Sequence, residues 1–110
     1  MRYVILAKTR ISFDYDGTLS TTKGKELAQE KISTGHDVWI ITARQREGNN
    51  DAVNSTAERL GIPRSRIKYT NGKDKWTYMN RYDIDIHYDN NPEQVDKINE
   101  KTLTRAILFT

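Results

Sequence analysis

Two aspartates one residue apart, Asp14 and Asp16, follow a short β-prone apolar run and come directly before Gly17. Side chains alternate between the two faces of a strand, so this spacing predicts that both carboxylates point the same way. Neighbouring carboxylates repel each other unless a cation, a proton or a hydrogen-bond donor offsets their charge. Gly17 permits a turn that aims backbone N–H groups at the same place. The stretch can therefore hold a divalent cation beside an anion, although a plain polar strand end with an Asp-Gly turn is the simpler alternative.

Five β-prone segments alternate with helical segments and must position these acids. The predicted strands are residues 10–14, 37–42, 67–70, 84–89 and 105–109, and the predicted helices are residues 25–33, 51–60, 75–81 and a last one that starts at residues 91–93. Short connections between alternating strands and helices imply right-handed crossovers. The pattern therefore predicts an α/β fold, a three-layer Rossmann-like open parallel sheet of about five strands with helices on both faces. Residues 3–7 fit either an extra strand or a lead-in.

Local signals refine several of these segments. The nearly continuous apolar run 37–42 predicts a strand that is buried on both faces. Asp74 is a candidate N-cap for the helix at residues 75–81. His87 is interpreted as an ordinary strand side chain with no metal-ligating partner, and Trp39 and Trp76 are interpreted as core residues.

The composition indicates one small domain, residues 1–110, with 35% hydrophobic and 30% charged residues. No apolar run approaches the roughly 20 residues of a membrane span, and the N-terminal apolar stretch is too short for a signal peptide. The chain has no cysteine, which excludes disulfides and thiolate metal sites and fits a cytoplasmic protein.

Positive charge is concentrated in the middle of the chain. Residues 44–82 contain nine basic and four acidic residues, a net charge of +5 within a chain whose total is +3. Such a segment suggests an anionic substrate or partner, with an ordinary solvated surface as the alternative.

Polar residues follow four of the predicted strands. Because ligands bind at the carboxyl edge of an open parallel sheet, these residues are expected to converge there. They are Asp14, Asp16, Gly17 and Thr18 at the end of the first strand, Thr42 and Arg44 at the end of the second, Lys73 and Lys75 beyond the third, and Asp89, Asn90 and Asn91 at the end of the fourth.

These residue types suit phosphoryl chemistry. A carboxylate can attack phosphorus to form an aspartyl-phosphate, and a second acid can protonate the leaving oxygen and then activate water. Mg²⁺ prefers oxygen ligands, usually one or two carboxylates with water and phosphate oxygens. A threonine hydroxyl and a lysine at the start of a helix can stabilise the charge that develops on the phosphoryl group.

The constellation resembles the haloacid dehalogenase superfamily of phosphohydrolases over nearly the whole chain. The sequence at residues 14–19 is similar to the first family motif, Asp-x-Asp-Gly-Thr, and residues 40–44 resemble the second, an apolar strand that ends in Ser or Thr. Lys75, or alternatively Lys73, fits the third motif, and residues 86–91 resemble the fourth, an acidic strand end. The resemblance implies a Rossmann-like sheet in the order 5-4-1-2-3.

The resemblance also implies roles for individual residues. Asp14 would be the nucleophile and a Mg²⁺ ligand. Asp16 would be the general acid and base and would bind Mg²⁺ through its backbone carbonyl, and Asp89 would be the third contact to the metal. Thr42 and Lys75 would hold the phosphate. The remaining candidates for substrate binding are Tyr15, Gly17, Thr18, Arg44 and Lys73.

One position departs from the family pattern. The fourth motif often has two acids, but Asn90 follows Asp89, and Glu93 is the other candidate for the second acid. The chain is therefore interpreted as a Mg²⁺-dependent phosphatase, with a non-catalytic phosphate-binding or interaction module on the same fold as the alternative. A small phosphotransferase would differ only in the acceptor.

The predicted segments leave no room for the cap domain that family members often carry. Capless relatives tend to act on macromolecules or borrow a cover from a neighbouring subunit. Together with the basic middle segment, this suggests a nucleotide or a nucleic-acid terminal phosphate as substrate, as in the phosphatase half of polynucleotide kinase-phosphatase proteins, for a monomer or homo-oligomer without membrane contact.

Overall fold

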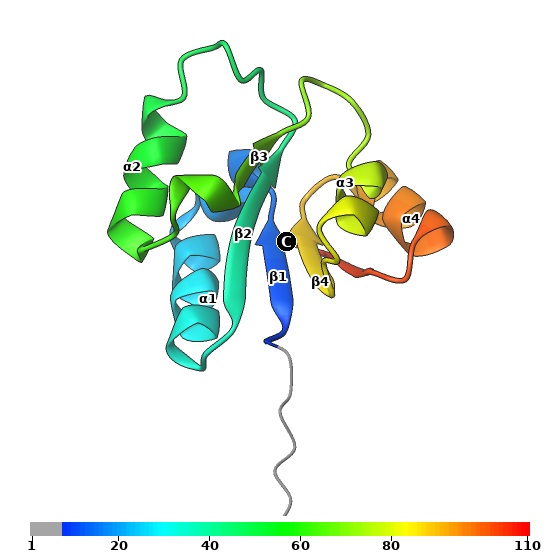
Figure 1. The fold of residues 1–110 in the computed structure, drawn as a ribbon, viewed down its shortest axis with the longest axis horizontal. Helices are drawn as coiled ribbons and strands as arrows, with labels where there is room; N and C mark the ends of the chain where they lie inside the picture. The colour runs from blue at the N-terminus through cyan, green and yellow to red at the C-terminus, as the bar shows by residue number, and fades with distance from the viewer. Residues whose placement is uncertain (1–7) are drawn as a thin grey trace, which may run out of the picture.

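The computed structural model describes residues 8–110, so the alternatives for residues 3–7 fall outside the described residues. An irregular helical turn, Tyr15–Leu19, follows the first strand, and a short 3-10 turn, Arg64–Arg66, precedes the third. The strands are β1 (Arg10–Phe13), β2 (Asp37–Thr42), β3 (Ile67–Tyr69), β4 (Ile86–Asp89) and β5 (Arg105–Leu108), and the helices are α1 (Thr22–Ser33), α2 (Asp51–Leu60), α3 (Trp76–Arg81) and α4 (Pro92–Lys101) (Figure 1).

The strands form one parallel sheet in the order β3-β2-β1-β4-β5. The predicted parallel α/β fold is therefore confirmed, including its strand order. β1 lies in the centre, where Phe13 pairs in register with Ile40 of β2 on one side and Tyr88 of β4 on the other. The polar residues that follow β1 are consequently flanked by the ends of two neighbouring strands.

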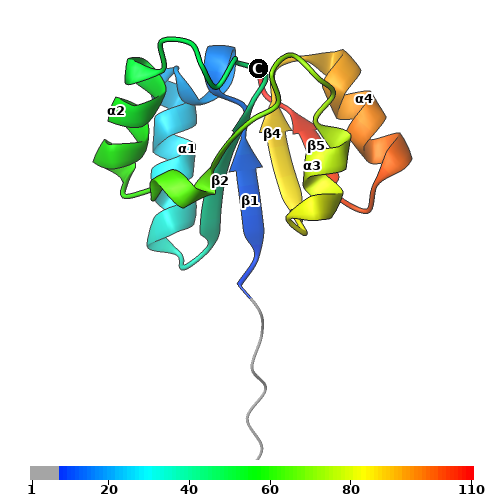
Figure 2. The ribbon, with the colours of Figure 1, turned by 45° about the horizontal axis from the view of Figure 1, so that its top comes forward.

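Helices cover both faces of the sheet, with α1 and α2 on one face and α3 and α4 on the other (Figure 2). β2 packs against both layers, because Val38 and Ile40 belong to the core cluster on the α1 side and Trp39 and Ile41 to the cluster on the α3 side. Every residue of β2 after the first is buried. The prediction of a strand buried on both faces is confirmed.

The start of α1 supports the turn that follows β1. α1 begins at Thr22, three residues before the predicted start, because the Thr21 side chain accepts a hydrogen bond from the Gly24 N–H over 3.0 Å and so caps the helix. Gly24 is buried, and a Cβ at this position would overlap the carbonyl oxygen of Thr18. The first turn of α1 therefore packs directly against the turn Tyr15–Leu19.

The predicted N-cap at Asp74 is wrong. α3 begins at Trp76, and the carboxylate of Asp74 accepts hydrogen bonds from Gln94 and Lys97 of α4 instead. The strand expected at 84–89 begins two residues later, at Ile86, because the chain is still turning after α3, with Asp83 at a φ of 50°.

The start of α4 agrees with its sequence signal. Asn91 accepts a hydrogen bond from the Glu93 N–H over 3.0 Å, and Pro92 occupies the first helical position.

Of the helices in residues 8–110, none has the length and apolar character needed to cross a membrane.

Candidate functional site

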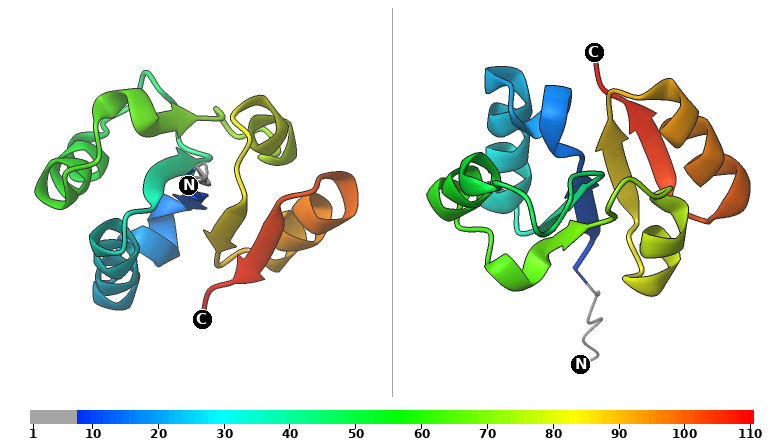
Figure 3. Two further views of the ribbon diagram at one scale, coloured as in Figure 1. Left: turned by 60° about the horizontal axis from the view of Figure 1, so that its bottom comes forward. Right: turned by 90° about the horizontal axis from the view of Figure 1, so that it is seen from above.

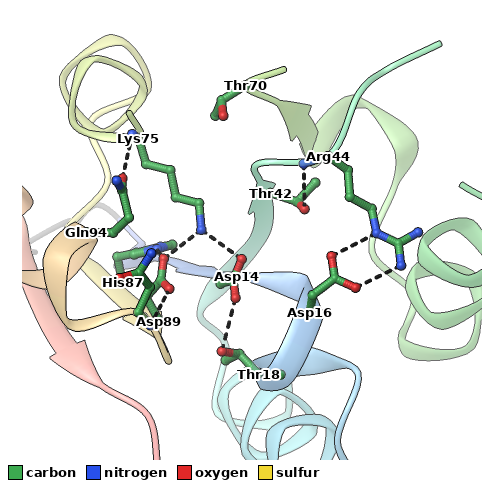
Figure 4. A network of polar contacts seen from close by, with 12 residues as sticks. Asp14, Asp16, Thr18, Thr42, Arg44, Thr70, Lys75, His87, Asp89 and Gln94 are labelled. Atoms are coloured by element: carbon green, nitrogen blue, oxygen red, sulfur yellow. Dashed lines mark hydrogen bonds and ion pairs between the residues drawn. The ribbon is translucent and has the colours of Figure 1, made fainter. Parts of the chain in front are cut away.

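A cluster of polar side chains lies at the carboxyl edge of the sheet (Figure 4). Asp14 directly follows β1, Thr42 ends β2 and Asp89 ends β4. These three residues are only 6%, 1% and 0% exposed. The structure therefore brings together the residues that the sequence places at the ends of these three strands.

Lys75 lies at the centre of this cluster. Its Nζ donates to Asp14 Oδ1 and to Asp89 Oδ2, each over 2.7 Å, and the side chain is 4% exposed. The residue immediately precedes α3, and Gln94 of α4 accepts its backbone N–H over 3.0 Å. Of the two candidate lysines, Lys75 is the one that reaches the strand ends, whereas Lys73 is exposed.

Asp14 is a buried carboxylate whose charge is only partly offset. Burial raises its pKa above the ordinary aspartate value, and the charge of Asp89 acts in the same direction, whereas Lys75 opposes both. Its second oxygen, Oδ2, faces the Thr18 hydroxyl at 3.4 Å. Asp14 thus has one oxygen bound to an ammonium group and the other facing neutral donors.

Asp89 is held in its ionised form by several donors. Burial by itself would raise its pKa, but the hydrogen bond from His87 and the charge of Lys75 outweigh that effect and lower the pKa to about 2. Oδ1 accepts the N–H of Asn91 over 3.0 Å, and Oδ2 lies 2.9 Å from His87 Nε2. Asp89 therefore carries a negative charge at neutral pH.

His87 is a side chain of β4, as expected, and it also contacts the site. It is fully buried, and burial lowers its pKa, so the imidazole is neutral at pH 7. The carboxylate of Asp89 can only accept, so Nε2 carries the proton, and Nδ1 lies 2.6 Å from the Ser12 hydroxyl as an acceptor. The two-residue spacing of His87 and Asp89 on one strand places both side chains on the same face. This spacing is the signal in the sequence that could have placed His87 in the site.

Asp16 occupies a different environment from Asp14, although both residues follow β1. β1 ends at Phe13, and Asp16 lies in the turn that follows, where strand alternation no longer applies. Its carboxylate accepts two hydrogen bonds from the Arg44 guanidinium, over 2.8 and 2.9 Å. The hydrogen bond from Arg44 lowers the pKa of Asp16, although its side chain is 60% exposed.

The Asn90 amide lies between the two acidic positions. It faces Asp14 Oδ2 and the backbone carbonyl of Asp16, and with its nitrogen toward them it donates over 3.0 and 3.2 Å. Glu93, the other candidate for a second acid, forms an ion pair with Lys97 over 3.0 Å and is 70% exposed. Of these two residues, Asn90 is therefore the one that contacts Asp14 and Asp16.

The donor set is suited to Mg²⁺, although within residues 8–110 no cluster of three or more His, Cys, Asp or Glu side chains is arranged as a metal site. The Asp14 carboxylate and the Asp16 carbonyl both face Asn90, and the Asp89 carboxylate shares Lys75 with Asp14. All three groups are oxygen donors of the kind that Mg²⁺ prefers. The chemistry of the residues present therefore fits this ion.

The other predicted site residues lie in different surroundings. The Thr42 hydroxyl accepts the Arg44 N–H over 3.3 Å at the edge of the cluster. The Tyr15 side chain is 5% exposed and its hydroxyl faces Thr56, so this ring belongs to the core. The Gly17 N–H donates to the Ser20 hydroxyl over 2.9 Å.

Comparison with known proteins does not identify this site. No protein-family model and no curated protein matches the chain. Its function has to be inferred from the residues and geometry described above.

Proposed function

We propose that this chain is a Mg²⁺-dependent phosphohydrolase that cleaves phosphomonoesters through an aspartyl-phosphate on Asp14. The observation that carries the proposal is the buried Asp14 carboxylate at the end of the central strand, bound to Lys75 on one oxygen. Burial raises its pKa, and a desolvated carboxylate has fewer solvent hydrogen bonds to lose when it attacks phosphorus.

Mg²⁺ would be held by the carboxylates of Asp14 and Asp89 and by the backbone carbonyl of Asp16. Bound there, the ion supplies positive charge that orients the phosphate and stabilises the charge of the transition state. Lys75 already lies against both carboxylates, and its ammonium group supplies a second positive charge to the same place.

The chemistry needs two steps. In the first, an Asp14 carboxylate oxygen attacks phosphorus, the bond from phosphorus to the ester oxygen breaks, and Asp16 gives the leaving alcohol a proton. In the second, Asp16 takes a proton from water, the water oxygen attacks phosphorus, and the aspartyl bond breaks to release inorganic phosphate.

Asp16 is better prepared for the second step than for the first. The hydrogen bond from Arg44 lowers the pKa of Asp16, which favours the ionised base. Acting as an acid requires a proton and a weaker contact with Arg44. A substrate phosphate that attracts the Arg44 guanidinium would weaken this contact, so Arg44 serves as a substrate contact that also adjusts Asp16.

A phosphate-binding module without catalysis is the second candidate. One observation favours it, because the Asn90 amide and the Lys75 ammonium together satisfy the Asp14 carboxylate without any metal ion. In that case the edge of the sheet would bind phosphate and never form a covalent intermediate.

Hydrolysis of a generic aryl phosphate with and without Mg²⁺ tests the proposal. Replacing Asp14 with Asn should lower Mg²⁺-dependent turnover by at least about 10³-fold, the scale on which loss of a nucleophile acts. The matched control is Asp96→Asn, an exposed aspartate on α4, which should retain turnover. Equal turnover in the wild type and Asp14→Asn would overturn the covalent mechanism, and phosphate binding without any Mg²⁺-dependent turnover would favour the module.

A further inference from the structure

A groove of about 630 Å³ lies outside the Asp14 cluster, between α2, β3 and α3. β3 is the edge strand of the sheet, and it runs between these two helices when the molecule is seen from above (Figure 3). The volume falls within the range of ligand sites. Nothing in the proposed chemistry uses this groove.

The lining of the groove is strongly basic. Arg46, Arg64, Lys68 and Arg81 contribute four positive charges, whereas Asp51 is the single acid among its lining residues. None of the four cations belongs to an ion pair among residues 8–110. Three of them, the arginines, are exposed. Such unneutralised cations attract a polyanion.

Aromatic rings line the same groove beside these charges. Tyr78 and Tyr82 lie one helical turn apart, with ring centroids separated by 6.4 Å. Lys68 Nζ lies 4.7 Å from the Tyr82 ring centroid, and the Arg81 guanidinium lies 5.5 Å from that of Tyr78. Cations that bind phosphates, next to partly exposed aromatic rings, are a combination that binds single-stranded nucleic acid.

The groove reaches the Asp14 cluster through Tyr69 and Arg44. Tyr69 lines the groove and pairs in register with Thr42 of the cluster. The Arg44 guanidinium contacts both Asp16 and the groove. It binds the carboxylate of Asp16, and it also donates over 3.4 Å to the backbone carbonyl of Asn49, which lines the groove. A nucleic-acid strand lying in the groove can therefore extend toward Asp16 by way of Arg44.

We propose that this groove binds single-stranded nucleic acid and delivers its terminal phosphate to Asp14. The assignment of the substrate phosphate rests on the proposed function, whereas binding of the strand does not. The positive charge of the groove alone would suit an acidic peptide as well as a nucleic acid. The tyrosine rings favour a nucleic acid, because bases offer flat faces to stack on and glutamate or aspartate side chains do not.

Fluorescence anisotropy with an eight-nucleotide oligo-dT that lacks a terminal phosphate tests strand binding without catalysis. The double variant Arg64→Gln/Arg81→Gln should bind at least about 10-fold more weakly. Its slope of log affinity against log salt should be shallower by about 1.4, because each lost phosphate contact on a single strand contributes about 0.7. The control Arg59→Gln/Arg105→Gln removes two exposed arginines that do not line the groove and should bind as the wild type does.

Several results would overturn the groove proposal. One is equal weakening in the two double variants, which would mean that only net charge matters. Another is displacement of the oligonucleotide by poly-glutamate of the same charge as readily as by unlabelled oligo-dT. By contrast, oligonucleotide binding that depends on Arg64 and Arg81, in a protein that hydrolyses no aryl phosphate, would remove the proposed hydrolysis and leave the groove proposal supported.

Discussion

Lys75 Nζ lies 2.7 Å from Asp14 Oδ1, although 61 residues separate them in the sequence. The same nitrogen lies 2.7 Å from Asp89, so one buried cation bridges the carboxylates at the ends of the neighbouring strands β1 and β4. The three groups together carry one net negative charge when ionised. That excess favours a further cation, and it makes Lys75 the residue on which the stability of the cluster depends.

Replacing Lys75 with Met should lower the free energy of unfolding by about 3–5 kcal/mol at pH 7, because a buried charge loses its partner. Added Mg²⁺ should restore more stability to this variant than to the wild type, since only the folded state offers the site. Urea unfolding with and without Mg²⁺ measures both effects. Lys73→Met, at an exposed residue, should change stability by less than about 0.5 kcal/mol, and an equally small loss in Lys75→Met would contradict the central role of Lys75.

His87→Leu should weaken Mg²⁺ binding by about 10- to 100-fold, because His87 orients the carboxylate of Asp89 through Nε2. Isothermal titration with Mg²⁺ measures the change. Ser12→Ala, which removes only the partner of Nδ1, should have a smaller effect. Unchanged Mg²⁺ affinity in His87→Leu would exclude Asp89 as a metal ligand that His87 positions.

His87→Leu should also change how the free energy of unfolding depends on pH. The pKa of Asp89 is about 2 in the folded protein, below the ordinary value near 3.9. A lowered pKa contributes stability above the unfolded value, and this contribution is lost as pH falls toward 2. His87→Leu should reduce that contribution and also remove the acid-induced loss due to the buried His87, whose own pKa is lowered, so urea unfolding between pH 7 and pH 3 should show a smaller acid-induced loss in the variant. A larger acid-induced loss would contradict this origin of the Asp89 shift.

Arg44→Gln should raise the pKa of Asp16, since the hydrogen bond from Arg44 is what lowers it. The limb of the pH–rate profile that requires protonated Asp16 should therefore move to higher pH, most clearly with alkyl phosphates, whose leaving groups need a proton. Stability should change by at most about 1 kcal/mol, because the pair is partly exposed. An unmoved limb, with Arg59→Gln as reference, would show that Asp16 is not the acid.

Asn90→Asp should act in opposite directions with and without metal. A carboxylate beside Asp14 Oδ2 loses the amide's hydrogen bonds and adds repulsion, so the metal-free protein should lose about 1–3 kcal/mol. Mg²⁺ should bind at least about 10-fold more tightly, since a unit charge about 4 Å away contributes about 4 kcal/mol at an effective dielectric of 20. Thermal unfolding at several Mg²⁺ concentrations measures both effects, with Asn90→Ala as the uncharged reference. Tighter binding in Asn90→Ala than in Asn90→Asp would contradict the electrostatic argument.

Most of the fold could be predicted because its signals are local. The apolar run of β2 and the Asn-Pro start of α4 each specify an element through residues that are adjacent in the sequence. The errors occurred where a distant segment decided the outcome. Asp74 has the side chain of an N-cap, yet Gln94 and Lys97 of α4 lie close enough to take its carboxylate instead.

The sequence by itself determined most of the residues that gather at the carboxyl edge, because parallel strands all end at one edge and these polar residues lie at or just after the strand ends. Only the tertiary structure decided which of them bind one another. Strand order brings Ser12 next to His87, 75 residues away, and the end of β1 at Phe13 turns Asp16 toward Arg44. Pairing and burial of this kind depend on the spacing between distant segments, which no local pattern of residues contains.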